Sequence, residues 1–308
     1  MKKITAFAPA TVANVCCGFD ILGFAIFAPA DEVTVSFRKE TGIVIQKIVG
    51  DGGRLPLDSA KNTAGVAVQS FLNAIDSSQG VAIEIKKKLP LGSGMGSSAS
   101  SAAAALVAIN ELMGNIFTRK ELVPFALAAE KMACGVAHAD NVAPSIMGGF
   151  VLVRDYENLD LIQIPSFPPL SCCLVHPHLE VNTSDSRKVL KSTISLKDSL
   201  TQNGNLATLM VGLMSGDYSL ISRSLHDVIA EPERSAFIPD FKNIKNLALS
   251  LGALGFGISG SGPSVFALCK DEETAKRIGK AVSERFQRLN LGSDEFISGI
   301  NNKGAWIE

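Results

Sequence analysis

The chain has 308 residues, a formal net charge of −1 and 46% apolar residues. This length is enough for one large or two ordinary domains with a sizeable core, and the near-neutral charge gives no reason to expect a nucleic acid or an acidic membrane as a partner. The apolar runs are broken by glycine, serine or charge before they reach membrane-spanning length, and the first residues lack the sustained apolar core of a signal peptide. Six cysteines occur without a Cys-x-x-Cys or zinc spacing, so we expect reduced thiols in a cytoplasmic protein.

The N-terminal region combines a predicted strand over residues 4–8 with a segment over residues 8–23 that is too apolar for an ordinary surface loop. This segment nevertheless carries Asn14 and Asp20. A polar group in apolar surroundings needs a hydrogen-bonding partner, which either the protein or a ligand supplies. From the local sequence, these two side chains could therefore either cap turns or face a ligand.

Hydrophobic periodicity defines the next elements. We expect strands over residues 31–37, 43–48 and 81–86, and a helix over residues 61–75 with one apolar face. Asn62 lies at the start of this helix, where an asparagine side chain is a favourable N-cap.

A glycine–serine stretch separates the strand over residues 81–86 from an alanine-rich helix that begins near Ser97. Its three glycines at alternate positions allow sharp bends and the close approach of a ligand. The helix start offers free N–H groups and the positive end of a dipole, which favour phosphate. Ser97 and Ser98 could cap the helix, bind phosphate or hold Mg²⁺. No lysine follows Gly96, as a Walker loop requires, and the glycine spacing differs from the dinucleotide fingerprint, so the stretch could also be a flexible turn.

A predicted helix and a polar turn follow the alanine-rich helix. Residues 118–121 fit a capping box and should open the helix. Glu130 lies near its end, where the dipole disfavours a carboxylate and a lone glutamate is usually solvent-facing. His138, Asp140 and Asn141 then occur together in a turn-like stretch, in which a histidine is more often structural than catalytic.

A proline-bearing segment over residues 161–169 should connect the first half of the chain to the second. We expect a strand over residues 150–154, a domain boundary near residue 160, and a strand over residues 171–176. Helices are predicted over residues 206–214 and 220–228.

Two arginines in this half allow two interpretations. Thr183 and Arg187 are four residues apart, so on a helix they share a face. Arg187 and Arg234 could be solvated surface charges. They could equally converge on a carboxylate, which a guanidinium binds through two parallel hydrogen bonds.

A second glycine–serine loop is predicted over residues 255–263, with a strand behind it over residues 265–269. Asp271 should open an amphipathic helix. On its own, the glycine–serine loop over residues 255–263 could also be a glycine-rich β-bulge. The last predicted strand covers residues 305–308.

The stretch from Pro90, with the pattern Pro-x-x-x-Gly-x-Gly-Ser-Ser-Ala, resembles the nucleotide loop of the GHMP kinases, with Met95 in place of the usual leucine. Three further segments, residues 14–23, 138–149 and 227–234, resemble the homoserine kinases within that superfamily, and the resemblance covers nearly the whole chain. It implies an α/β plus α+β architecture of the GHMP kinase fold. An N-terminal ribosomal-protein-S5-like domain (residues 1–160) binds ATP, and a C-terminal ferredoxin-like domain (residues 161–308) follows it.

The resemblance also implies the reaction and its residues. The reaction is the ATP-dependent phosphorylation of L-homoserine to O-phospho-L-homoserine in threonine biosynthesis, by a homodimer. The substrate contacts it implies are Asn14, Asp20, His138, Arg187, Arg234 and Gly260. The nucleotide contacts are Asn62, Pro90, Leu91, Gly92, Ser93, Gly94, Met95, Gly96, Ser97, Ser98, Ala99 and Ser100. Ser98 and Glu130 are assigned to Mg²⁺, with Ser97 as the alternative ligand, and Thr183 and Asn141 to catalysis.

The residue that receives the hydroxyl proton is a point of departure within the superfamily. Mevalonate kinases and galactokinases carry an aspartate where the homoserine kinases have an asparagine, here Asn141. An amide cannot act as a base, so we predict that the proton passes to phosphate or water in a loose transition state. Two other functions stay open: a GHMP kinase for another small alcohol, and a non-catalytic ATP-binding sensor.

Overall fold

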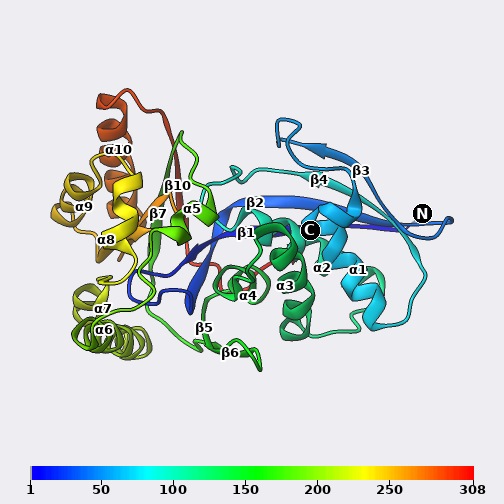
Figure 1. The fold of residues 1–308 in the computed structure, drawn as a ribbon, viewed down its shortest axis with the longest axis horizontal. Coiled ribbons are helices and arrows are strands. Elements are labelled where there is room, and N and C mark those ends of the chain that lie inside the picture. The colour runs from blue at the N-terminus through cyan, green and yellow to red at the C-terminus, as the bar shows by residue number, and fades with distance from the viewer. Residues whose placement is uncertain (1) are drawn as a thin grey trace.

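The computed structural model describes residues 2–308, whose strands form two sheets that lie next to each other along the long axis of the molecule (Figure 1). The first sheet has the order β11-β1-β2-β4-β3, and β5 and β6 extend it from β2. Its strands are β1 (Lys3–Ala13), β2 (Leu22–Arg38), β3 (Ile43–Val49), β4 (Gly80–Lys86), β5 (Phe150–Asp155), β6 (Asp160–Gln163) and β11 (Trp306–Ile307).

The second sheet is antiparallel and has the order β10-β7-β9-β8. Its strands are β7 (Ser171–Pro177), β8 (Gly255–Ile258), β9 (Val265–Cys269) and β10 (Ser293–Gly299). In chain order this is a 4-1-3-2 arrangement, the order of a ferredoxin-like sheet, as the resemblance implied.

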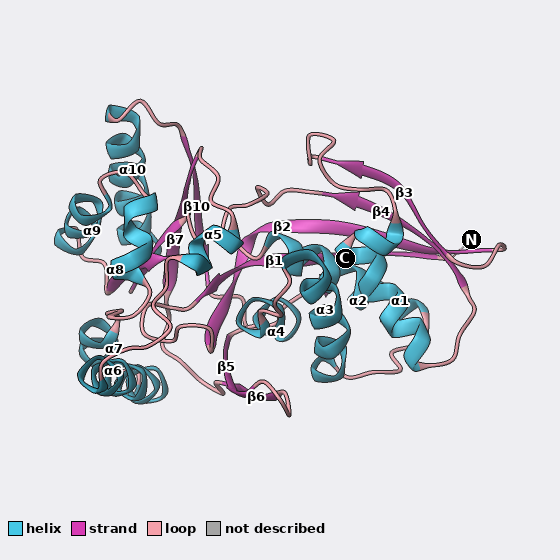
Figure 2. Ribbon diagram, in the orientation of Figure 1, coloured by secondary structure: helices cyan, strands magenta, loops and turns pink. Residues whose placement is uncertain are grey.

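Helices cover both sheets (Figure 2). The first sheet carries α1 (Thr63–Ala74), α2 (Ser97–Leu112), α3 (Arg119–Cys134) and α4 (Ala139–Met147), with η1 (Ser59–Lys61) before α1. The second half contains α5 (Thr183–Lys188), α6 (Leu196–Ser215), α7 (Tyr218–Ser224), α8 (Glu231–Arg234), η2 (Ser235–Phe237), α9 (Phe241–Ser250) and α10 (Glu272–Arg288). Across residues 2–308 no helix combines the length and the apolar character that crossing a membrane requires.

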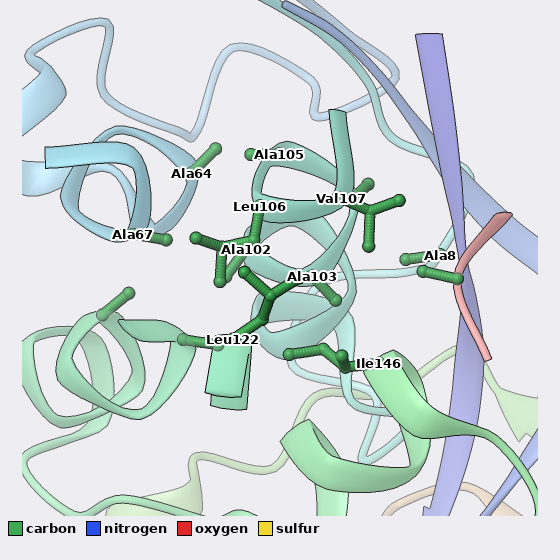
Figure 3. Packing of buried hydrophobic residues seen from close by; sticks show 14 of the residues in the cluster. Ala8, Ala64, Ala67, Ala102, Ala103, Ala105, Leu106, Val107, Leu122 and Ile146 are labelled. Carbon is green, nitrogen blue, oxygen red and sulfur yellow. The ribbon is translucent and has the colours of Figure 1, made fainter. Parts of the chain in front are cut away.

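Helix α2 is buried on all sides, and its alanines allow this. Figure 3 shows Ala102, Ala103 and Ala105 between α1, α3 and the first sheet, with Leu106 reaching the same core. All four are at most 1% exposed. Small side chains let helices and sheet approach closely, so the N-terminal end of α2 is held rigidly where the glycine–serine loop enters it.

One apolar cluster joins the two sheets. Phe24 of β2 packs edge-on against Phe266 of β9, with ring centroids 6.1 Å apart, and Met95 lies in the same cluster. The chain changes from the first sheet to the second between Gln163 and Ser171, and β11 returns to pair with β1. The division at residue 160 stays a prediction.

Most predicted elements are confirmed, and the differences have identifiable causes. The strands predicted over residues 4–8 and 31–37 are both longer, because β1 and the first part of β2 are buried on both faces and show no alternation. The predicted loop over residues 255–263 begins as strand β8. Strand β10 and helix α9 were not predicted, and the helix predicted over residues 206–214 is part of the longer α6.

Candidate active site

A cleft of about 310 Å³ collects most of the predicted site residues. The glycine–serine loop, the segment after β1, the α3–α4 junction and α5 all contribute to its walls. The predicted residues that line it are Asn14, Asp20, Asn62, Leu91, Gly92, Ser93, Gly94, Gly96, Ser97, Ser98, Glu130, His138, Asn141, Thr183, Arg187, Arg234 and Gly260.

Four predicted nucleotide contacts do not line the cleft with their side chains. Met95 is fully buried in the cluster that joins the sheets, and Ala99, in the first turn of α2, is fully buried in the core of the first sheet. Ser100 Oγ donates to the Ala8 carbonyl at 2.7 Å, and the Pro90 carbonyl accepts a hydrogen bond from Ser93 Oγ at 2.7 Å. These residues therefore shape the loop rather than present side chains to a ligand.

The glycine–serine loop has the geometry of an anion cradle. Gly92, Gly94 and Gly96 have φ values of 66°, 76° and 70°, in the left-handed region that favours glycine. A Cβ on Gly94 would lie 2.4 Å from the Ser259 carbonyl oxygen, so only glycine fits against the second glycine–serine loop. Gly96 is the N-cap of α2, and no side chain caps the helix, so the first N–H groups of α2 are available to a phosphate.

A polar pair at the start of α2 fits a hard cation. Ser98 Oγ donates to Glu130 Oε2 at 2.8 Å, and Glu130 is 5% exposed, so the expectation of a solvent-facing glutamate is wrong. Ser97 Oγ instead points to the Leu89 carbonyl at 3.3 Å. A hydroxyl and a carboxylate are oxygen ligands of the kind that Mg²⁺ takes, with phosphate and water completing its shell. The geometry favours Ser98 over Ser97.

His138 continues this polar line across the cleft. Its Nδ1 lies 3.4 Å from Glu130 Oε1, and its Nε2 lies 3.5 Å from Arg187 Nη2. Burial by itself lowers the pKa of His138, but the carboxylates of Glu130, Asp140 and Asp20 outweigh it, and the pKa of His138 is raised. His138 therefore lines the cleft as one member of a network of charged side chains.

The two arginines lie together at one end of the cleft but differ in their partners. Arg187 Nη2 donates to both oxygens of Asp20, at 3.0 and 2.9 Å. Arg234 is 4% exposed and donates to two carbonyls, from Nε to Ser186 at 3.2 Å and from Nη1 to Gly260 at 3.0 Å. Burial lowers the pKa of Arg234, and within residues 2–308 no carboxylate lies within ion-pair distance of its guanidinium.

Phe19 organises these two guanidinium groups. The ring centroid lies 5.2 Å from Arg234 Cζ and 6.0 Å from Arg187 Cζ. Cation–π contacts of this kind orient a guanidinium plane without using its N–H donors. The surface-charge interpretation of the arginines is therefore wrong for Arg234, and its remaining donors are available to an anion in the cleft.

Asn14 and Asn62 act as structural caps as well as lining residues. Asn14 Oδ1 accepts from the Asp20 N–H at 2.9 Å, and Asn14 Nδ2 donates to the Gly260 carbonyl at 2.8 Å. Asn62 Oδ1 accepts from the Ala64 N–H at 3.0 Å and caps α1. The cap interpretation is confirmed for both. A ligand could therefore contact only the donor and acceptor positions of each amide that these hydrogen bonds do not use.

Asn141 is oriented by a residue that the sequence analysis did not single out. Thr11 Oγ1 donates to Asn141 Oδ1 at 2.7 Å, which leaves the Asn141 NH₂ group for the cleft. Thr183 Oγ1 lies 3.4 Å from Ser261 Oγ, at the start of α5. Thr11 lies inside the apolar segment over residues 8–23. A polar side chain in such a segment needs a hydrogen-bonding partner, and this was the sequence signal that could have identified Thr11.

A buried ion pair was also missed. Lys87 Nζ donates to Asp31 and to the Ser97 carbonyl, the latter at 2.7 Å, and both charged side chains are at most 1% exposed. The Asp31 carboxylate also accepts from the N–H groups of Lys88 and Leu89. The pair ties β2 and the end of β4 to the first turn of α2, and no local pattern marks such a long-range contact.

Asp140 is the most perturbed carboxyl group in the cleft. It is 2% exposed, and within the described residues its Oδ1 has no hydrogen-bond partner. Burial and the nearby Asp20 raise the pKa of Asp140 to about 7. Near neutral pH this side chain therefore exists in both protonation states.

For the kinase activity that the sequence resemblance implies, we expect Thr11→Val to lower kcat about tenfold with little change in the KM for ATP. The variant removes the hydroxyl that fixes the Asn141 amide but keeps the side-chain shape, and one positioning hydrogen bond is worth about 1 to 1.5 kcal/mol. Steady-state rates with both substrates measure this. Thr11→Ser keeps the hydroxyl and should restore most of kcat; equal losses in both variants would show that packing, not the hydrogen bond, matters.

Comparisons with known proteins give a consistent result. The GHMP kinase N-terminal domain family matches residues 62–149, and the GHMP kinase C-terminal family matches residues 195–288. The homoserine kinases of Chlorobium phaeovibrioides and Chloroherpeton thalassium are 53% and 50% identical to this chain, over 100% of both chains in each case. The crystal structure of homoserine kinase from Cytophaga hutchinsonii has a TM-score of 0.97 at 49% identity and covers 100% of this chain and 98% of that chain.

Proposed function

We propose that this chain, which belongs to the homoserine kinase family of the GHMP kinases, transfers the γ-phosphoryl group of ATP to the hydroxyl of L-homoserine. The products are O-phospho-L-homoserine and ADP, in threonine biosynthesis. The observation that supports the substrate most directly is Arg234, a buried guanidinium that has carbonyl partners but no carboxylate partner within residues 2–308. An α-carboxylate supplies the missing charge.

L-Homoserine has three polar groups, and the cleft has a complementary group for each. Arg234, with Arg187 beside it, binds the carboxylate. Asp20 accepts from the ammonium group, while Asn14 and Gly260 hold the segment that carries it. The Asn141 NH₂ group donates to the substrate hydroxyl, and Thr183 lies close to the group being transferred.

Phosphoryl transfer depends on alignment and charge neutralisation more than on covalent help from the protein. The N–H groups of the loop over residues 92–98 hold the phosphates at the positive end of α2. Ser98 and Glu130 would hold Mg²⁺, which would supply charge neutralisation at the phosphates. Because the Asn141 amide cannot accept the hydroxyl proton, the proton passes to a phosphate oxygen or to water.

The proposal includes three further parts that follow from the family resemblance. The chain divides into residues 1–160 and 161–308, it acts in the cytoplasm, and it forms a homodimer. The five cysteines whose side chains are described are all free and buried, which suits a reducing compartment.

The test is ADP release with ATP and Mg²⁺ in the presence of L-homoserine, L-serine, L-threonine, mevalonate or galactose. We expect ADP and a phosphorylated amino acid with L-homoserine alone. ADP release with another alcohol would leave the kinase activity in place and would change the assignment of the substrate-binding residues. Measurable ATP binding with no ADP from any of them would indicate a sensor instead.

We expect Ser98→Ala to lower kcat about 10- to 100-fold and to raise the Mg²⁺ concentration needed for half-maximal rate, because it removes the proposed metal ligand and one of the partners of Glu130. Initial rates across a Mg²⁺ titration measure both effects. Ser97→Ala is the matched control, since Ser97 Oγ is directed to the Leu89 carbonyl. A larger loss in Ser97→Ala than in Ser98→Ala would reverse the assignment.

A further inference from the structure

Gln202 is a buried polar residue on the inner face of α6, and it is only 5% exposed. Its Nε2 donates to the Cys17 carbonyl at 3.0 Å and to Asp227 Oδ1 at 3.2 Å. Its Oε1 accepts from the Val228 N–H at 3.0 Å. A buried amide whose donors and acceptor all have partners fixes the groups that it contacts, because leaving any of them without a partner is costly. Gln202 therefore joins α6 to two other segments, the one after β1 (residues 14–21) and the one before α8 (residues 227–230).

Asp227 closes the turn that leads to Arg234. It is also 5% exposed, and its Oδ1 accepts from the N–H groups of Ile229 and Ala230 at 2.8 and 3.1 Å, while its Oδ2 accepts from Glu231 at 2.9 Å. The Ala230 carbonyl in turn accepts from the Arg234 N–H at 2.9 Å. An aspartate that accepts from N–H groups two to four residues ahead fixes the backbone of a turn. The direction from which the Arg234 side chain starts therefore depends on the Asp227 carboxyl group.

The two segments that Gln202 joins meet again at the amino-acid end of the cleft. The segment after β1 carries Phe19, two residues beyond Cys17, and the Phe19 ring centroid lies 5.2 Å from Arg234 Cζ. Neither Gln202 nor Asp227 is among the described residues that line the cleft. Their effect on the site therefore passes through the backbone that they hold.

We propose that Gln202 and Asp227 are positioning residues for substrate binding: they hold the two segments in the arrangement that presents Arg234, backed by Phe19, to the substrate carboxylate. The identity of that substrate rests on the proposed function. A guanidinium binds a carboxylate through directional hydrogen bonds, so a small displacement weakens the contact strongly. The nucleotide loop is held by other contacts, the ion pair beneath the first turn of α2. The effect is therefore confined to the amino-acid end of the cleft.

The test compares the full chain with Gln202→Met, which keeps the length of the side chain but removes its amide donors and acceptor. We expect kcat/KM for L-homoserine to fall about tenfold through KM, while kcat and the KM for ATP change less than about threefold. Asn203→Ala, at the neighbouring exposed position of α6, is the matched control and should change none of these values. A loss below about threefold, or an equal rise in both KM values, would overturn the proposal.

A double-mutant cycle separates positioning of Arg234 from a general loss of stability. If Gln202 acts through Arg234, Gln202→Met should lower kcat/KM less than about twofold in a chain that already carries Arg234→Met. A loss of about tenfold in both backgrounds would show that the packing of α6 matters instead, and would overturn the proposal. Asp227→Asn removes one acceptor from the turn side of the same contact and should give the same selective loss, so a misfolded Gln202→Met does not end the test.

Hydrogen exchange in the ligand-free protein tests the positioning without any substrate. We expect the amides of residues 228–231 to exchange at least about tenfold faster in Gln202→Met, because the Val228 N–H loses its acceptor and the turn loses its support. The amides of residues 97–101 in α2 should keep their rates. Unchanged exchange over residues 228–231 would overturn the proposal. An unchanged protein that releases no ADP with L-homoserine would instead contradict the proposed function, and the exchange rates would still decide whether Gln202 holds this turn.

Discussion

Replacing Arg234 by Met lowers kcat/KM for L-homoserine about 100- to 1,000-fold in the outcome that we expect. The guanidinium is buried, fixed by the Ser186 and Gly260 carbonyls and placed over Phe19, so its position is set before the substrate arrives. Losing a charge-assisted, bidentate contact in such a site costs about 3 to 4 kcal/mol, which corresponds to a factor of about 10² to 10³. Initial rates at varied L-homoserine concentration measure the loss.

The effect of Arg234→Met should be confined to the amino-acid end of the cleft. ATP affinity, measured by titration calorimetry, should change less than about threefold. The reason is that Arg234 donates to the Ser186 and Gly260 carbonyls and not to the nucleotide loop. Arg223→Met, at an exposed position on α7, is the matched control and should leave the rates unchanged. A loss below about fivefold in Arg234→Met would show that the carboxylate binds elsewhere.

Asp140→Asn should stabilise the folded protein at neutral pH. The pKa of Asp140 is raised from its ordinary value of 3.8 to about 7, first by burial and then by Asp20. The folded protein therefore binds this proton more tightly than the unfolded chain does. The ionised carboxyl group destabilises the fold increasingly as pH rises from about 4 to about 7, and then fully above pH 7. A difference of about 3 pH units sets an upper limit of about 4 kcal/mol on the gain.

The measurement is urea unfolding of both proteins between pH 4 and pH 8.5. The two free energies of unfolding should nearly coincide at pH 4 and separate as pH rises, with the variant more stable. Asp76→Asn removes the same charge at an exposed position and should show no such separation. A variant that is less stable at pH 8, or a difference that does not change with pH, would contradict the assigned pKa.

The same variant tests the proposal that no side chain takes the hydroxyl proton. If Asn141 only donates to the substrate hydroxyl, Asp140→Asn should lower kcat less than about tenfold. A loss of about a thousandfold or more in a folded variant, the upper part of the range for a general base, would identify Asp140 as the base.

The parts of the site that the sequence determined are those that depend on neighbours in the chain. Glycines at alternate positions before an alanine-rich helix allow sharp bends, and Gly92, Gly94 and Gly96 take positive φ values that favour glycine. The helix that follows them begins with free N–H groups, as expected. The capping box at Thr118 and the Asp271 cap are likewise local interactions, and both are confirmed. The family was also readable, since its motifs are short strings of sequence.

Only the tertiary structure decided which of two adjacent or competing groups faces the cleft. Ser97 and Ser98 are equivalent in sequence, but the helix rotates Ser98 toward Glu130 and Ser97 toward Leu89. Glu130 is buried because α3 packs against the start of α2. The sequence of α3 alone does not predict this contact. The Thr11–Asn141 and Lys87–Asp31 contacts join residues 130 and 56 positions apart. Hydrogen bonds and burial act through space, so contacts of this kind are fixed only when the sheets and helices have packed.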